Sequence, residues 1–176
     1  MFIRLLEERR SIRNYLKNPV EPEKIDILIE AALRSPSSRS LNPWEFIVVT
    51  EKDILEKLST SKKHGAGFLK DAPLGIVVLA DPRKCDVWIE DASIASVFIH
   101  LAATSLGLGS CWIQIRERMV DAGRSSEDYV REVLAIPEKI RVLSIIAVGY
   151  PDEEADGHPK NSLLFNRIHR NRFGAS

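Results

Sequence analysis

The run Leu74-Gly-Ile-Val-Val-Leu-Ala80 determines the fold, because almost every one of its side chains is apolar. Residues 142–148, Val-Leu-Ser-Ile-Ile-Ala-Val, form a second run of the same kind. A strand with one face in water alternates apolar and polar residues, whereas a strand covered on both faces is apolar almost throughout. We therefore expect these two runs to lie in the middle of a sheet that has helices on both faces.

The segment between the two runs contains the longest predicted helix, residues 87–106. Its small and apolar residues lie on nearly all sides, which is typical of a buried helix, and Gly107 and Gly109 end it. Shorter patterns predict strands over residues 45–50 and 110–113, and helices over residues 22–35, 50–59 and 125–134. Two of these helices start with the spacing of a capping box, Thr50-x-x-Asp53 and Ser125-x-x-Asp128. The sequence thus predicts an α+β fold with α/β-type layers, in a single domain over residues 1–176.

Charge and composition exclude several classes of protein. The 176 residues include 25 Lys and Arg and 25 Asp and Glu, so no net field draws the molecule to nucleic acid or to a membrane. The first ten residues carry too much charge for a signal peptide, and no apolar run reaches the roughly 18 residues of a membrane span. Cys85 and Cys111 lack the spacing of a zinc site or a disulfide framework. We expect a cytoplasmic protein with two buried thiols and no metal site.

A basic cluster, Arg9-Arg10-Ser11-Ile12-Arg13, places three guanidinium groups and a hydroxyl group within five positions, where a helix is expected to end. Arginine suits phosphate because its planar fork donates in parallel to two oxygen atoms. Taken alone, such a cluster is more often a solvated charged surface. Two interpretations therefore stay open for it, an anion site and an exposed basic surface.

A polar loop, Ser35-Pro-Ser-Ser-Arg-Ser-Leu-Asn-Pro-Trp44, separates a predicted helix from the strand that follows it. Two prolines stiffen the loop, and its hydroxyl and amide groups offer hydrogen bonds to a flat polar ligand. A structural turn that Trp44 anchors in the core is the other interpretation. Together with the basic cluster, the loop suggests a site for an anionic ligand that bears a ring.

The helix over residues 87–106 offers no catalytic triad or carboxylate pair. His100 lies among apolar residues, where a packed core histidine is expected. Glu90 and Asp91 are adjacent in sequence and therefore point to different faces of the helix. The sequence predicts no acid and base pair there.

The basic cluster and the polar loop occur in order with a third motif, Gly107-Leu-Gly-Ser-Cys-Trp-Ile-Gln114, and with an Asn171-Arg-Phe-Gly174 ending. In this combination the chain resembles the nitroreductase family of flavoproteins over nearly its whole length. The resemblance implies a nitroreductase-like fold, in which helices flank a central mixed β-sheet and two chains form an intertwined homodimer. It also implies FMN sites at the subunit interface.

The resemblance assigns individual contacts to FMN. Arg9 and Ser11 would meet the phosphate, and Arg13 would reach the ribityl chain and the pyrimidine edge of the ring, where a cation stabilises the reduced flavin. The loop would come from the other subunit, with Ser40 and Asn42 in place of the family's usual Asn and Gln. No side chain need act as a catalytic residue, and Arg13 tunes the flavin. The cofactor-binding positions implied in this way are Arg9, Arg10, Ser11, Arg13, Pro36, Ser37, Ser38, Ser40, Asn42, Cys111, Trp112, Ile113 and Lys160.

The resemblance further implies an FMN-dependent oxidoreductase with a ping-pong cycle. NADH or NADPH delivers hydride to flavin N5 and leaves, and a small aromatic acceptor such as a nitroaromatic compound, or a quinone, then takes the electrons. The flavin carries the chemistry, and the protein binds and orients it. The alternative is a non-catalytic module that holds FMN, or another phosphate-bearing ligand, without turnover.

Overall fold

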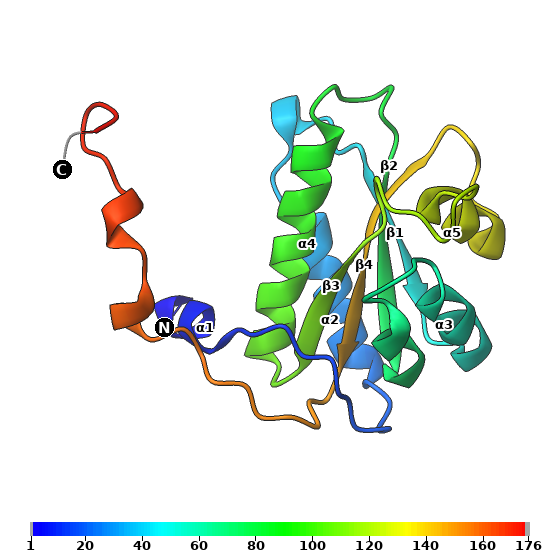
Figure 1. Ribbon diagram of the computed structural model, residues 1–176, viewed down its shortest axis with the longest axis horizontal. Helices are drawn as coiled ribbons and strands as arrows, with labels where there is room; N and C mark the ends of the chain where they lie inside the picture. Colours follow the sequence, from blue (N-terminus) through cyan, green and yellow to red (C-terminus); the bar gives the residue numbers. More distant parts are fainter. Residues whose placement is uncertain (1, 175–176) are drawn as a thin grey trace.

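The computed structural model describes residues 2–174, in which helices cover both faces of a four-stranded sheet (Figure 1). The helices are α1 (Phe2–Glu8), α2 (Pro22–Leu33), α3 (Lys52–Ser59), α4 (Trp88–Ser105) and α5 (Ser126–Leu134). The strands are β1 (Trp44–Val49), β2 (Leu74–Ala80), β3 (Gly109–Gln114) and β4 (Arg141–Gly149). Short 3₁₀ helices are η1 (Ser38–Ser40), η2 (Gly67–Asp71), η3 (Lys160–Ser162) and η4 (Phe165–Arg167). Among the described helices, none combines the length and the apolar character needed to cross a lipid bilayer.

The strands lie in the order β1-β2-β4-β3, and each neighbouring pair is antiparallel. The mixed sheet that the resemblance implies is therefore antiparallel in these four strands. The helix crossover from β2 to β3 does make those two strands parallel, but β4 lies between them, so they never pair. Parallel pairing in the described residues is limited to an isolated bridge between Ser11 and Ser110.

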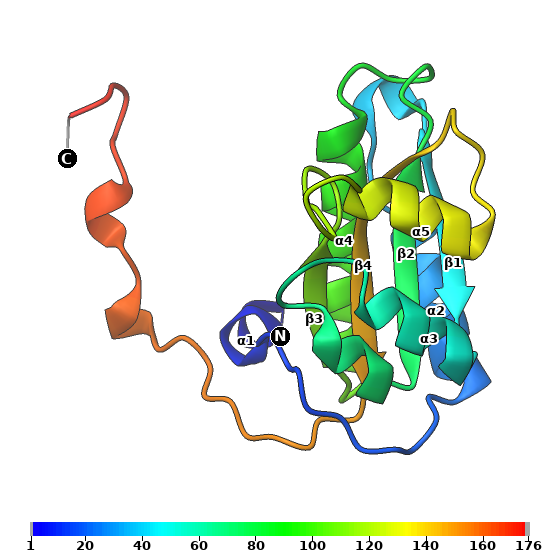
Figure 2. The same cartoon turned by 45° about the vertical axis from the view of Figure 1, so that its right-hand side comes forward.

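The two central strands are covered on both faces, as their apolar runs predict. All seven residues of β2 are buried, and they alternate between two core clusters. Leu74, Ile76 and Val78 pack with residues of α2 and α4, whereas Val77 and Leu79 pack with residues of α3 and α5. Figures 1 and 2 show these two helix pairs on opposite sides of the sheet. This alternation is the period-2 geometry of a strand between two helical layers.

The two predicted capping boxes have different outcomes. Ser125 caps α5, because its Oγ accepts a hydrogen bond from the Asp128 N–H at 3.0 Å. Thr50 does not cap α3, so that expectation is wrong. The N-cap is Glu51, whose carbonyl already accepts the N–H of Leu55 at 3.0 Å, and its side chain makes no capping bond. The helix therefore starts one residue later than a Thr50 cap requires.

After β4 the chain leaves the body of the protein and extends past α1 (Figure 2). Every residue from His158 to Gly174 is exposed. Large apolar side chains are among them, with Leu164 67%, Phe165 62% and Phe173 91% exposed. We call residues 158–174 the tail. Its apolar side chains have nothing to cover them within the described part of this chain.

Candidate functional site

The basic cluster follows the end of α1 at Glu8, as expected, and then runs along the outer edge of β3. The Ile12 N–H donates a hydrogen bond to the Ser110 carbonyl at 3.0 Å. Ile12 is buried, whereas Ser11 and Arg13 on either side of it are exposed. The extended backbone therefore turns the hydroxyl and guanidinium groups to the outside while Ile12 fixes the segment to the core.

Gly109 allows this close approach of the two segments. A Cβ atom at position 109 would lie 2.7 Å from the Ile12 Cβ. That distance is shorter than any normal contact between carbon atoms. The glycine of the third motif thus has a packing role that sets the position of the basic cluster.

The guanidinium groups of Arg9 and Arg13 form no hydrogen bond or ion pair to the residues described. Arg10 differs, because its guanidinium donates to the Asp156 carbonyl. The Arg13 guanidinium carbon lies 6.0 Å from the centre of the Phe68 ring. Two of the three arginines therefore keep their donors for a ligand.

Glu153, in the segment after β4, holds the backbone of the cluster from the other side. Its carboxylate accepts the N–H of Arg13 and, at 3.0 Å, that of Asn14. These backbone bonds lower the pKa of Glu153. The Arg13 side chain is thus presented from a backbone that is held at both sides.

Positive charge gathers where β3 begins. His100 is buried with its Nδ1 2.7 Å from Ser110 Oγ, and burial lowers its pKa to about 4, with a further contribution from Arg9. Burial also raises the pKa of the Cys111 thiol, while Arg13, a hydrogen bond to Ser11 and Lys62 oppose that rise. The predictions of a packed core histidine and of a buried Cys111 are confirmed. Lys62 was missed, because it lies in a polar loop that carries no motif.

Strand β3 can meet a ligand through its backbone more readily than through its side chains. Cys111 is 2% and Ile113 0% exposed, so both side chains belong to the core. Trp112 is half-buried, and its Nε1 donates to Gln114 Oε1 at 2.9 Å. Because β3 is an edge strand and the Ser110 carbonyl faces outward, backbone alternation places the Trp112 N–H on the same outer edge.

The polar loop folds on itself. Trp44 is buried and lies 5.6 Å from the Phe46 ring between centroids, so the expected anchoring in the core is present. The Asn42 N–H donates to Ser37 Oγ at 2.9 Å, and that hydroxyl donates to Asn42 Oδ1 at 2.7 Å. These two side chains therefore shape the loop. The hydroxyl groups of Ser38 and Ser40 make no hydrogen bond within residues 2–174.

Asp91 is a second residue that the sequence interpretation missed. It is 2% exposed, and its Oδ1 accepts the Ser38 N–H at 2.8 Å. It lies in the first turn of α4. An aspartate among the apolar residues of a helix is a signal in the sequence that could have drawn attention to Asp91. The sequence does not show that its partner is Ser38, because the two residues are far apart along the chain.

The basic cluster and the polar loop lie at different ends of α4 (Figure 1). The loop is bonded to Asp91, near the start of the helix, whereas the cluster lies beside Ser110 and His100. His100 lies nine positions after Asp91 along the helix, which corresponds to a rise of about 13 Å. One chain alone does not bring these two groups together.

Lys160, the implied cofactor-binding residue farthest along the chain, lies in the tail. The His158 N–H donates to the Glu7 carbonyl at 3.2 Å, so the tail backbone contacts α1 just before η3. Lys160 begins η3, two residues after this contact. Its ammonium group is exposed. The structure thus places Lys160 just beyond the point where the tail contacts α1, with no contact to Arg9 or Arg10 within the described residues.

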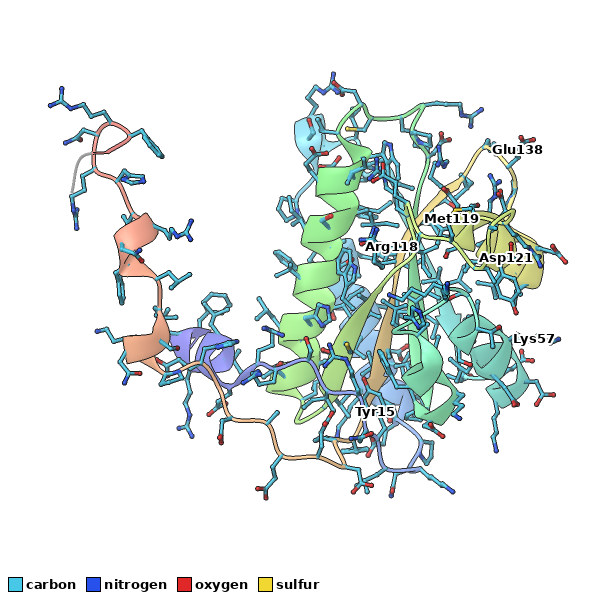
Figure 3. All side chains as sticks on the ribbon, in the orientation of Figure 1. Tyr15, Lys57, Arg118, Met119, Asp121 and Glu138 are labelled. Carbon is cyan, nitrogen blue, oxygen red and sulfur yellow. The ribbon has the colours of Figure 1, made fainter. Side chains whose placement is uncertain are left out.

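Two pockets of the surface lie away from these residues. A pocket of about 600 Å³ contains Tyr15, Lys17 and Lys70, and one of about 460 Å³ contains Arg118 and Met119. Figure 3 shows Tyr15 well apart from Arg118 and Met119. None of the implied cofactor-binding positions lines either pocket. Within residues 2–174, no three His, Cys, Asp or Glu side chains gather in a way that could hold a metal ion.

Comparison with known proteins identifies the family to which the chain is similar. The sequence model described as "Nitroreductase family" matches residues 6–65 and 58–150. The solved structure of an FMN-dependent nitroreductase from Clostridium difficile R20291 is 50% identical, with a TM-score of 0.96 over 97% of this chain and 99% of that one.

Two curated relatives are also similar. One from Archaeoglobus fulgidus, whose name includes NADH dehydrogenase and NAD(P)H nitroreductase, is 37% identical over 97% of this chain and 98% of its own. An "FMN reductase [NAD(P)H]" from Bacillus subtilis is 28% identical over 90% of this chain and 69% of its own. On the family match and these likenesses, the chain belongs to the nitroreductase family.

Proposed function

We propose that this protein is an FMN-dependent oxidoreductase that takes reducing equivalents from NADH or NADPH and passes them to a nitroaromatic compound, a quinone or a similar acceptor. The names of the relatives from Clostridium difficile, Archaeoglobus fulgidus and Bacillus subtilis support the cofactor and the electron donor. One observation carries the proposal. The guanidinium groups of Arg9 and Arg13, on either side of the exposed Ser11, make no hydrogen bond or ion pair within the described residues.

These residues fit the phosphate end of FMN. Guanidinium groups and a hydroxyl group are the donors that phosphate oxygens accept best, and here they point outward from a fixed backbone. The positive charge of Arg9 already contributes to the low pKa of the buried His100. An anion bound there would offset that charge. Lys160, on the neighbouring tail, adds a further cation in the proposed site.

The proposed part of Arg13 is to place positive charge at the pyrimidine edge of the ring. When bound, FMN supplies the hydride chemistry, and the chain supplies orientation and electrostatics. Arg13 keeps its donors unpaired and faces Phe68, so an aromatic surface and a cation lie together. The outward Trp112 N–H is the proposed backbone donor to the ring. No acid or base side chain is needed for these tasks.

We propose that each site is shared between two chains of a homodimer. The separation of the polar loop from the basic cluster along α4 supports this, because a second copy can supply the missing half (Figure 1). The exposed apolar side chains of the tail support it as well, since they suit burial against a partner. Pro36, Ser37, Ser38, Ser40 and Asn42 would then contact FMN from the partner subunit.

The remaining alternative is a module that holds FMN without turnover. One experiment separates the two: titrate the purified protein with FMN, remove oxygen and add NADH or NADPH while the absorbance of oxidised flavin is recorded. The proposal expects tight FMN binding and bleaching by at least one of the two donors. Bound FMN that neither donor bleaches would favour the binding module, and a folded protein that binds no FMN would exclude both.

A further inference from the structure

The polar loop has an unusual backbone for a segment without glycine. Arg39, Ser40 and Asn42 have φ angles of 51°, 54° and 45°, in the left-handed region that most side chains avoid. Three such residues within four positions do not persist unless the surroundings hold them. Residues held in this way cluster at ligand sites, where a backbone has to be ready before the ligand arrives.

The end of the loop is fixed by the buried Trp44 and by the Pro43 carbonyl, which accepts the Asp81 N–H at 2.9 Å, but few contacts hold residues 37–42 to the rest of the protein. The bonds between Ser37 and Asn42 are internal to the loop. Arg39 pairs with Asp86, but both side chains are largely exposed, at 63% and 77%. An exposed pair of this kind contributes little to a fixed geometry.

Asp91 makes the buried attachment. One carboxylate oxygen accepts the Ser38 N–H at 2.8 Å, and the other accepts the Cys85 S–H at 3.2 Å. Asp91 and Cys85 are each 2% exposed. A carboxylate buried this far is a strong acceptor, because water does not compete for it. It meets the loop at Ser38, one residue before the left-handed stretch begins.

We propose that Asp91 is a positioning residue for FMN: its buried carboxylate holds the Ser38 N–H and so keeps the strained polar loop in the conformation that meets the cofactor. The inference rests on the proposed function, because it assigns this loop to the FMN site. It also explains why an acidic residue lies in the small and apolar stretch of α4. Asp91 itself does not touch the cofactor.

The test compares the FMN affinity of apoproteins prepared from the wild type and from variants, by quenching of flavin fluorescence. Asp91→Ala loses the bond to Ser38 and is expected to raise Kd at least about tenfold. Asp91→Asn keeps an oxygen acceptor of nearly the same shape, so its Kd should stay within about threefold of the wild type. Cys85→Ala removes only the weak S–H donor and should also stay within about threefold.

Thermal unfolding with and without FMN separates positioning from general stability. A residue with only a structural role would lower Tm by the same amount in both states. Loss of positioning shrinks the rise in Tm that saturating FMN produces, because that rise follows the affinity. We expect a smaller rise for Asp91→Ala and a normal one for Asp91→Asn.

The FMN affinities of these variants distinguish an error in the role of Asp91 from an error in the proposed function. If the wild type binds FMN, Arg13→Ala loses it, and Asp91→Ala binds as tightly as the wild type, the positioning role is wrong and the site stands. The positioning role is equally wrong if Asp91→Asn binds FMN as weakly as Asp91→Ala. If the folded wild type binds no FMN at all, both proposals are overturned.

Discussion

The two ends of α4 hold their ligand-facing segments by different means. Near its start, Asp91 fixes the polar loop through one buried side-chain bond, and the loop backbone is strained. Near its end, the basic cluster has an unstrained, extended backbone that pairs with β3, and His100 supports Ser110 there. The start of the polar loop is therefore held by one buried side chain and its end by Trp44 in the core, whereas the basic cluster depends on sheet geometry.

The largest effect is expected at the His100 end, as a pH dependence of stability. The folded pKa of about 4 lies below the ordinary value of 6.5, so the folded protein keeps His100 neutral while the unfolded chain takes up a proton. Stability is therefore lost as the pH falls from about 6.5 toward 4, by about 3 kcal/mol at most. Urea unfolding of wild type and His100→Gln at pH 7.5 and pH 4.5 measures this loss.

The difference in lost stability between the wild type and His100→Gln gives the contribution of His100. The pKa of Glu153 is lowered, so its contribution is lost only at still lower pH, and it is common to both proteins. We expect His100→Gln to lose less stability on acidification than the wild type. Equal losses would mean that burial of His100 does not oppose its protonation.

The next largest effect is expected on FMN affinity when the basic cluster loses the charge of Arg13. Arg13→Ala should raise the Kd for FMN by about 10- to 100-fold, which corresponds to about 1.5–3 kcal/mol for a charge-assisted hydrogen bond. Arg13→Lys keeps the charge without the fork and should be intermediate. Arg34→Ala is the matched control, because Arg34 is an exposed arginine at the end of α2 that pairs with Glu30. An Arg13→Ala protein with normal affinity would remove Arg13 from the site.

A comparable effect is expected from Gly109→Ala, which tests the sheet geometry directly. The new Cβ meets Ile12, so the basic cluster has to move, with a loss of about 1–3 kcal/mol of stability and weaker FMN binding. Gly107→Ala is the control, because Gly107 has a φ of 72° and nothing within 4 Å of an added Cβ. Its cost is backbone strain alone. Equal FMN affinities for the two variants would show that the spacing of Ile12 and Gly109 does not matter.

The smallest effect belongs to the loop itself. Ser37→Ala removes the two hydrogen bonds with Asn42 and should weaken FMN binding by about fivefold, or about 1 kcal/mol. Ser162→Ala serves as the matched control, since the Ser162 hydroxyl makes only a local bond to the Pro159 carbonyl in the tail. Isothermal titration with FMN measures both. If Ser37→Ala binds FMN as tightly as the control, the hydrogen bonds between Ser37 and Asn42 are not needed to hold the loop in its FMN-binding conformation.

The sequence predicts the local structure of this fold well. Burial on both faces of β2 and β4 follows from their apolar runs, and α4 from its small and apolar residues, with bounds within one residue of the observed ones. These features depend on neighbours in the sequence, which a pattern of residues can report. The antiparallel pairing of the four described strands could not be predicted in this way, because it depends on the place of β4 between β2 and β3, which no local pattern reports.

The candidate site is predictable only where the chemistry of neighbouring residues in the sequence indicates a ligand. The guanidinium groups of Arg9 and Arg13 indicate an anion site through their chemistry, although their roles toward FMN stay predictions. Asp91 and Lys62 could not be found in this way. Asp91 binds Ser38, which lies 53 positions earlier in the chain, and the pKa of Lys62 is lowered by burial and by Arg118, 56 positions later. Such partners are chosen by the tertiary fold.

The sharing of each FMN site between two chains is the proposal on which the others depend, and a mixing experiment tests it. One variant, Arg13→Ala, breaks the basic cluster, and a second, Ser38→Glu, breaks the polar loop by setting a carboxylate against an anionic ligand. Each alone should bind little FMN. When the two are co-expressed, half of the randomly formed dimers are mixed and each mixed dimer has one intact site, so about a quarter of the wild-type FMN content should return. Mixed dimers that bind no more FMN than the parent variants would contradict a shared site.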